Sequence, residues 1–129
     1  MIISHGGMAE GVMSSASMLW PDLTQVGYLS LQPDTNPDDF QNELLKKIKE
    51  NDTGEGVYVL ADIMGGTPCN RALMLLGAGE NVRVLSGLSL TMLISLLNAR
   101  DFESDPDKIT STVLEETSAG TLYVNDLMK

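Results

Sequence analysis

Hydrophobic residues follow two patterns along this chain. The first is a nearly continuous apolar run, which is typical of strands buried on both faces of a sheet. Such runs predict strands at residues 2–4, 26–31, 57–61, 82–85 and 121–124. In between, apolar residues recur every three or four positions, which is the spacing of one helix face. This spacing predicts helices at residues 8–19, 37–50, 67–77, 89–100 and from 105 onward. In the first of them we expect one buried stripe, formed by Met8, Val12, Ala16 and Leu19.

Three of the predicted helices begin with a residue that favours N-caps followed by proline. The pairs are Asn36-Pro37, Thr67-Pro68 and Asp105-Pro106. The first side chain can accept a hydrogen bond from a free helix amide, and proline has no amide to leave unpaired. These pairs therefore indicate where the helices start.

Alternating strands and helices predict an α/β fold in which right-handed crossovers join parallel strands. The 129 residues have the length of one domain. We expect a three-layer sandwich over residues 1–129, with a mainly parallel sheet in the order 2-1-3-4, helices on both faces and a C-terminal edge strand. Ligands of such folds bind at the carboxyl ends of the strands where the strand order reverses. Here that point lies between strands 1 and 3.

Composition limits the classes of function. The chain has 18 acidic and 8 basic residues, a net charge of -10, which disfavours nucleic-acid binding and favours basic protein partners. No apolar run approaches the ~18 residues of a membrane span, and no signal peptide is evident. A single cysteine, Cys69, excludes an intrachain disulfide. These features predict a cytoplasmic protein.

His5 is the only histidine and directly follows the first apolar run. We therefore expect it at the carboxyl end of the first strand. An unperturbed imidazole has a pKa of about 6.5, so neutral histidine can act as a nucleophile or base near physiological pH. A lone histidine at a strand end is often just a polar residue without a chemical role. The residues expected near His5 distinguish this interpretation from a catalytic one.

Asp62 follows the third apolar run and is expected in the same crevice as His5. A carboxylate that accepts a hydrogen bond from one imidazole nitrogen fixes the tautomer and leaves the lone pair of the other nitrogen free. It also stabilises the cation that forms on attack. The alternative role for Asp62 is to accept hydrogen bonds from loop amides.

Gly65, Gly66 and Thr67 continue this loop into the next predicted helix. Backbone amides of glycines and the positive end of a helix both suit an anion, although a capped helix start has the same sequence. Ser86, after the fourth run, is a candidate for the far wall, where a plain turn is the alternative. Together with His5 and Asp62, these residues predict a phosphohistidine site that needs no metal ion, with amides holding the phosphoryl oxygens.

Three segments carry a family resemblance. They are ISHGGMAEG (residues 3–11), ADIMGGTPCN (61–70) and LSGL (85–88). In order and spacing the likeness covers essentially the whole chain, and the Ser-His-Gly and Gly-Gly-Thr-Pro motifs are specific as a pair. The chain resembles the enzyme IIA component of the mannose/sorbose class of bacterial sugar phosphotransferase systems (PTS).

The resemblance implies that His5 accepts a phosphoryl group at Nε2 from phospho-HPr, while its Nδ1–H faces Asp62, and passes the group to a IIB component. IIB phosphorylates a sugar of the mannose, sorbose, fructose or amino-sugar type that enters through the membrane components IIC and IID. No cofactor is implied beyond the transient phosphohistidine. The protein is then expected as a homodimer at the cytoplasmic side of the transporter, with the strand 121–124 able to cross to the partner's sheet.

The chain departs from the family pattern at a few positions. Cys69 stands where phenylalanine is usual, which predicts a looser wall of the crevice that bears a thiol. Ser89 and Thr91 replace the common asparagine and proline, which affects the expected partner-docking surface. The first strand is also short, because only four residues precede His5.

Other functions fit the same fold class. A receiver domain would place its phosphorylated aspartate at Asp62, but it needs an acidic pair after strand 1, where Ser4-His5-Gly6 offers none. The phosphotransfer subunit of a dihydroxyacetone kinase uses an equivalent histidine with a different motif after the acid. A catalytically idle or regulatory IIA-like docking domain is the remaining alternative.

Overall fold

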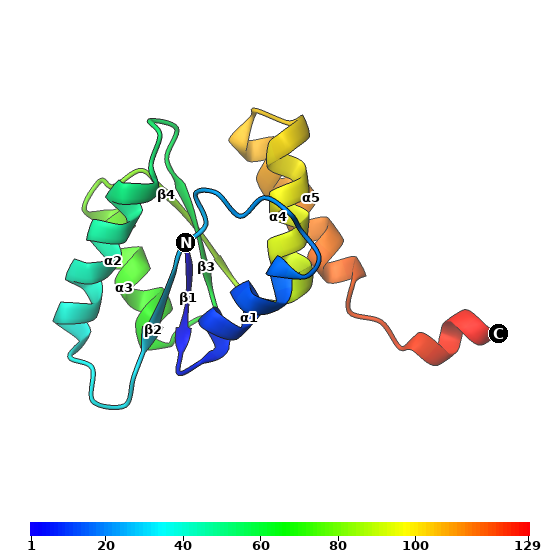
Figure 1. The fold of residues 1–129 in the computed structure, drawn as a ribbon, viewed down its shortest axis with the longest axis horizontal. Coiled ribbons are helices and arrows are strands. Elements are labelled where there is room, and N and C mark those ends of the chain that lie inside the picture. Colours follow the sequence, from blue (N-terminus) through cyan, green and yellow to red (C-terminus); the bar gives the residue numbers. More distant parts are fainter. The chain divides into compact units, whose positions relative to one another are not determined.

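The computed structural model describes residues 1–129, and its elements alternate as the sequence predicts (Figure 1). They are β1 (Ile2–His5), α1 (Met8–Ser17), β2 (Tyr28–Leu31), α2 (Pro37–Asn51), β3 (Val57–Ala61), α3 (Thr67–Gly77), β4 (Val82–Ser86), α4 (Leu90–Phe102), α5 (Pro106–Ala119) and a 3-10 helix, η1 (Val124–Met128). The chain divides into two compact units, Met1–Leu88 and Ser89–Lys129. None of the helices is long and apolar enough to cross a membrane.

The first unit holds a parallel sheet in the predicted order β2-β1-β3-β4. In register, His5 lies opposite Leu31 of β2, Ile3 lies opposite Ala61 of β3, and Ala61 lies opposite Ser86 of β4. Parallel pairing puts the carboxyl ends of all strands at one edge of the sheet. His5 and the residue that follows β3 are therefore neighbours.

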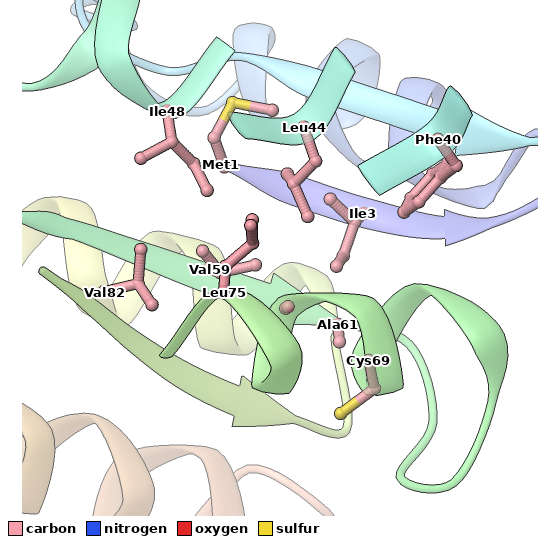
Figure 2. Close-up of a cluster of buried hydrophobic side chains, with 11 residues drawn as sticks. Met1, Ile3, Phe40, Leu44, Ile48, Val59, Ala61, Cys69, Leu75 and Val82 are labelled. Carbon is pink, nitrogen blue, oxygen red and sulfur yellow. The ribbon is translucent and has the colours of Figure 1, made fainter. Parts of the chain in front are cut away.

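Helices cover both faces of this sheet, with α2 and α3 on one face and α1 on the other (Figure 1). Successive strand residues point to opposite faces, and β1 follows this rule. Ile3 joins the core under α2 and α3, as Figure 2 shows, whereas Ser4 faces α1 and its Oγ accepts a hydrogen bond from the Ala9 amide at 2.7 Å. Three layers thus enclose β1 and fix the direction in which His5 leaves the sheet.

The core between the sheet and α2–α3 is made of buried aliphatic side chains and one phenylalanine (Figure 2). Its members include Met1, Ile3, Phe40, Leu44, Ile48, Val59, Ala61, Cys69, Ala72, Leu75 and Val82. Apolar burial contributes about 25 cal/mol per Å², so this cluster anchors the two strands that carry the site.

The helix starts agree with the sequence in two cases and differ in one. The Asn36 side chain accepts hydrogen bonds from the amides of the next turn, and Asp105 caps α5 in the same way. At α3, however, Gly66 occupies the N-cap position without a side-chain hydrogen bond, and Thr67 is already helical. The prediction that Thr67 caps this helix was wrong, because the chain approaches α3 with glycine backbone at the cap.

The stripe expected in the first helix is only partly buried. Ala16 is fully buried, but Met8 is exposed in the first turn, and Leu19 lies beyond the end of α1 and is exposed. The helix ends at Ser17, two residues earlier than predicted, so the spacing that placed Leu19 on the stripe no longer applies.

In the second unit, α4 and α5 pack against each other. Leu93 and Leu97 of α4 and Ile109 and Val113 of α5 are buried. Ser95, also buried, donates a hydrogen bond to the Glu116 carboxylate at 2.5 Å. These contacts make the two helices a unit of their own.

The strand predicted at residues 121–124 is not present in the single chain. Residues 121–123 have no regular structure, and a 3-10 helix begins at Val124. Leu122, Tyr123 and Val124 are all exposed. A strand needs a neighbour to receive its ladder hydrogen bonds, and a short apolar run alone does not supply one.

Candidate functional site

His5 and Asp62 lie at the ends of adjacent strands, 57 residues apart in sequence. His5 is the last residue of β1, and Asp62 follows the last residue of β3. The buried runs that precede them fix both backbones in the sheet. The crossover through β2 and α2 therefore brings together the two residues that the sequence singled out, and their chemical roles stay a prediction.

Asp62 binds His5 through two hydrogen bonds to one carboxylate oxygen. Oδ2 accepts from the His5 backbone amide at 2.8 Å and lies 2.7 Å from the imidazole Nδ1. Oδ1 accepts from the Ile63 amide at 2.8 Å. The Asp62 side chain is 10% exposed, whereas that of His5 is 50% exposed. The acid is thus held in place beside a half-exposed imidazole.

Opposing effects act on the pKa of Asp62. Burial raises it, but the hydrogen bonds from the His5 amide, the His5 imidazole and the Ile63 amide together hold the pKa below its ordinary value. At neutral pH Asp62 is therefore a carboxylate, which can only accept hydrogen bonds. The hydrogen between the two side chains must then reside on Nδ1 of His5, and in the neutral form of the imidazole this tautomer leaves a free lone pair on Nε2.

Gly66 backs the imidazole from the side of the β3–α3 loop. A Cβ atom at this position would lie 2.6 Å from His5 Cε1 and 3.3 Å from His5 Nε2. Distances below 3.0 Å essentially never occur for real Cβ atoms, so only glycine lets the backbone approach the ring this closely. Gly65, which precedes it, has φ of 87°, a conformation that L side chains rarely adopt.

The structure adds Asn70 to the residues that shape this loop. Its side-chain Nδ2 donates to the Gly65 carbonyl at 3.2 Å, and its backbone amide donates to the Gly66 carbonyl at 2.9 Å. These two bonds tie the glycine pair to the first turn of α3. Sequence reasoning included Asn70 in a family motif but gave it no role, although an amide side chain one turn after a glycine pair is a recognisable signal.

The other predicted phosphate ligands lie at the same edge of the sheet at different distances from His5. Thr67 is half-buried in the first turn of α3, next to Gly66. Ser86 ends β4 and is exposed, opposite Ala61. It is two strands away from His5, about 10 Å at the usual strand spacing. The glycine loop is thus beside the imidazole, and Ser86 is at the periphery.

Cys69 does not place a thiol on the surface of this site. Its side chain is 3% exposed and belongs to the core cluster under α2 and α3 (Figure 2). Burial raises the pKa of the Cys69 thiol, a hydrogen bond from the Gly65 backbone opposes this, and the charge of Asp62 raises it further. The expectation of a thiol-bearing wall was wrong, because α3 turns this position inward.

Metal-binding side chains do not gather anywhere in the structure: it has no group of three or more His, Cys, Asp or Glu residues that could hold a metal ion. The site consists of an imidazole, a carboxylate and a glycine-rich backbone next to a helix start. This arrangement offers a nucleophilic nitrogen, an acid that can stabilise positive charge on the ring, and amide donors for an anion.

A family model described as PTS system fructose IIA component, the mannose-type EIIA, matches residues 1–114. The chain belongs to this IIA family. The family match spans the first unit and most of the second. The resemblance recognised from three short segments is confirmed, and so is the α/β fold class.

Two curated relatives illustrate the class. The PTS system mannose-specific EIIAB component of Escherichia coli (strain K12) is 29% identical over 117 residues, which are 91% of this chain and 36% of the relative. The PTS system sorbose-specific EIIA component of Klebsiella pneumoniae is 28% identical over 95 residues, 74% of this chain and 69% of the relative. This IIA chain therefore spans about a third of the E. coli protein.

Solved structures agree with the fold. The mannose/sorbose specific IIA subunit from Enterococcus faecalis is 32% identical with a TM-score of 0.79, covering 94% of this chain and 90% of that one. An EIIA component from Streptococcus agalactiae has a TM-score of 0.86 at 23% identity, covering 97% and 95%. The second likeness bears on the fold alone.

Proposed function

We propose that this IIA chain is a phosphoryl carrier in which His5 Nε2 accepts a phosphoryl group from phospho-HPr and donates it to a IIB component. The observation that carries the proposal is the 2.7 Å contact between His5 Nδ1 and an Asp62 carboxylate of lowered pKa. In neutral His5 this contact puts the hydrogen on Nδ1 and leaves the lone pair of Nε2 for the reaction. Family membership supports the same assignment.

The transfer conserves protons. The Nε2 lone pair of His5 attacks phosphorus, the phosphorus–nitrogen bond of the donor breaks, and its electron pair returns to the donor's imidazole. The proton on Nδ1 stays where it is, and the positive charge that develops on the His5 ring is stabilised by the Asp62 carboxylate. Transfer to IIB is the same reaction with His5 as the leaving group. No cofactor takes part apart from the transient phosphohistidine.

The phosphoryl oxygens would be held by the loop after β3. Amides at Gly65, Gly66 and Thr67 and the amino-terminal end of α3 offer partial positive charge. Ser86 would serve as a more distant hydroxyl partner. Because the transition state for phosphoryl transfer spreads charge over three equatorial oxygens, several weak donors suit it better than one strong donor.

We further propose the location, substrate class and oligomeric state that the family name implies. The chain would work as one functional domain over residues 1–129, in the cytoplasm beside the membrane components IIC and IID. The transported sugar would be of the mannose, sorbose, fructose or amino-sugar type. A homodimer would give residues 121–124 the pairing strand that the single chain lacks. Light scattering tests this last point, because a monomer would leave the swapped strand without support.

Phosphorylation in vitro tests the central proposal. The protein is incubated with phosphoenolpyruvate, enzyme I and HPr, and intact-mass spectrometry follows the gain of one phosphate. We expect an acid-labile, base-stable adduct on the parent protein and none on His5→Ala. The matched control is Gln32→Ala, which removes an exposed polar side chain directly after β2 at the same sheet edge and should still be labelled. Equal labelling of His5→Ala and the parent would overturn the proposal.

A further inference from the structure

The glycine pair beside the imidazole combines a close approach with an intrinsically flexible backbone. Only glycine at position 66 lets the backbone come this near to His5 Cε1. The same lack of Cβ atoms gives Gly65 and Gly66 a wider range of backbone angles than other residues have. A loop that backs a reacting ring has to stay in one conformation, because small displacements of the ring slow the reaction. A group outside the pair must therefore restrain it.

One peptide plane joins the two glycines, and it is hydrogen-bonded at both ends. The Gly65 carbonyl and the Gly66 amide point in opposite directions because the peptide unit is planar and trans. The carbonyl accepts from Asn70 Nδ2 at 3.2 Å, and the amide donates to the Ile63 carbonyl at 3.4 Å. Both bonds are longer than the usual 2.9–3.0 Å, so neither holds the plane firmly by itself. Rotation of the plane would break both bonds and change how Gly66 meets the imidazole.

Asn70 has the position that such a restraint requires. It lies in the first part of α3, and its backbone amide donates to the Gly66 carbonyl at 2.9 Å. This helical bond fixes the Asn70 backbone relative to the loop. The side chain then turns back to Gly65, although the residue is exposed and water could satisfy its amide. Asparagine is also a poorer helix former than alanine, so the bond to Gly65 gives this position a reason to carry an amide.

We propose that Asn70 is a positioning residue for phosphoryl transfer, whose side chain holds the Gly65–Gly66 peptide in the orientation that keeps Gly66 against the His5 ring. Asn70 acts through the glycine backbone and needs no contact with the phosphoryl group. The ring is then held on two sides, by the Asp62 carboxylate at Nδ1 and by Gly66 near Cε1. The consequence for transfer rests on the proposed function of His5, whereas the restraint on the ring does not.

The single histidine makes this restraint directly measurable. His5 gives the only imidazole Cε1–H signal in a proton–carbon NMR spectrum, and Cε1 is the ring atom closest to a Cβ at position 66. Asn70→Ala removes the side-chain bond and keeps the helical bond of the backbone amide, and alanine favours the helix, so the fold should persist. We expect the Cε1–H signal to shift in this variant. Asn42→Ala, the same substitution at an exposed position of α2, should leave the signal in place.

Two phosphoryl donors test the consequence for transfer. With phospho-HPr, Asn70→Ala should lower kcat about tenfold, a loss typical of removing an orienting partner. Its KM and its thermal unfolding midpoint should stay close to those of the parent. The small-molecule donor phosphoramidate should label the variant more slowly by the same factor, because the defect lies at the ring and not in the contact with a donor protein. Asn42→Ala should match the parent with both donors.

Asn70→Asp separates the hydrogen bond from the shape of the side chain. An ionised aspartate has nearly the same size but presents only acceptor oxygens to the Gly65 carbonyl. We therefore expect a loss of kcat at least as large as in Asn70→Ala. Asn42→Asp carries the same change in net charge on α2 and should transfer like the parent.

Several outcomes would overturn the inference. One is a Cε1–H signal that keeps its parental position in Asn70→Ala, and another is a parental kcat in that variant. Parental transfer by Asn70→Asp would show that the shape of the side chain is enough. A loss confined to phospho-HPr would assign Asn70 to the contact with the donor instead. If neither donor labelled the parent, the proposed function of His5 would fail, while a shifted Cε1–H signal in Asn70→Ala would still support the restraint on the ring.

Discussion

Two glycine pairs flank His5, and they differ in how closely other residues pack against them. Gly6-Gly7, after β1, lies in open space, since a Cβ at either position would have no neighbour within 4 Å. The first glycine of each pair has a positive φ, 55° at Gly6 and 87° at Gly65, but only Gly66, the second glycine after β3, packs against the imidazole. The same dipeptide is thus a simple connection in one loop and part of the site in the other. The difference lies in the residue that packs against each pair.

The largest expected effect comes from Gly66→Ala. The added methyl would collide with His5 Cε1 at 2.6 Å, so the ring or the loop must move. Displacing a reacting group by about 1 Å can cost about a hundredfold in rate, and we expect at least that loss in phosphorylation by phospho-HPr. Rapid-quench kinetics measure it, with circular dichroism to confirm the fold. Transfer at the parental rate would show that the ring does not need this position.

Asp62→Asn should be next in size. The substitution keeps the shape of the side chain but removes the negative charge 2.7 Å from Nδ1 that we propose to stabilise the ring cation. Loss of such an orienting partner typically costs about ten- to hundredfold in activity. The phosphorylation rate is measured beside the thermal unfolding midpoint. Unchanged kinetics in a folded protein would contradict the role of Asp62.

Acid should weaken the link between the two loops. The pKa of Asp62 is lower in the folded protein than its ordinary value, so its contribution to stability is present above the unfolded pKa and is lost as the pH falls through the folded pKa. Urea unfolding of the parent and of Asp62→Asn should differ most near neutral pH, and the difference should shrink in acid. A constant difference across this range would mean that the carboxylate's ionisation does not matter.

Gly65→Ala isolates backbone strain from steric collision. Its φ of 87° is unfavourable for alanine, but a Cβ there would have no neighbour within 4 Å. We expect a loss of about 1–2 kcal/mol in the free energy of unfolding, measured by urea titration, and a smaller loss of transfer than in Gly66→Ala. A larger loss of transfer than in Gly66→Ala would reverse the proposed order of the two glycines.

Gly7→Ala should have the smallest effect. Gly7 has φ of -84° and ψ of 3°, which alanine can adopt, and the added methyl would meet nothing within 4 Å. As an N-cap substitution it should cost no more than about 1 kcal/mol of stability, with transfer close to that of the parent. A loss comparable to Gly66→Ala would show that the two loops are equally constrained.

Prediction from sequence succeeded where local patterns and pairing rules were enough. The buried runs before His5 and Asp62 are strands because continuous apolar stretches suit a parallel sheet, and the predicted order placed both residues at adjacent strand ends. It failed where a pattern depended on an unseen neighbour. Residues 121–124 form a short apolar run like those of the strands, but they pair with no strand in the single chain.

The sequence by itself determined the parallel fold, the neighbourhood of His5 and Asp62, and a family that the comparison confirms. It could do so because strand runs, helix caps and motif spacing are properties of short segments. Only the tertiary structure decided that Asp62 Oδ2 lies 2.7 Å from His5 Nδ1, that Cys69 is buried in the core, and that a Cβ at position 66 would collide with the imidazole. These facts depend on the distances between atoms of segments far apart in the chain, and no local pattern contains those distances.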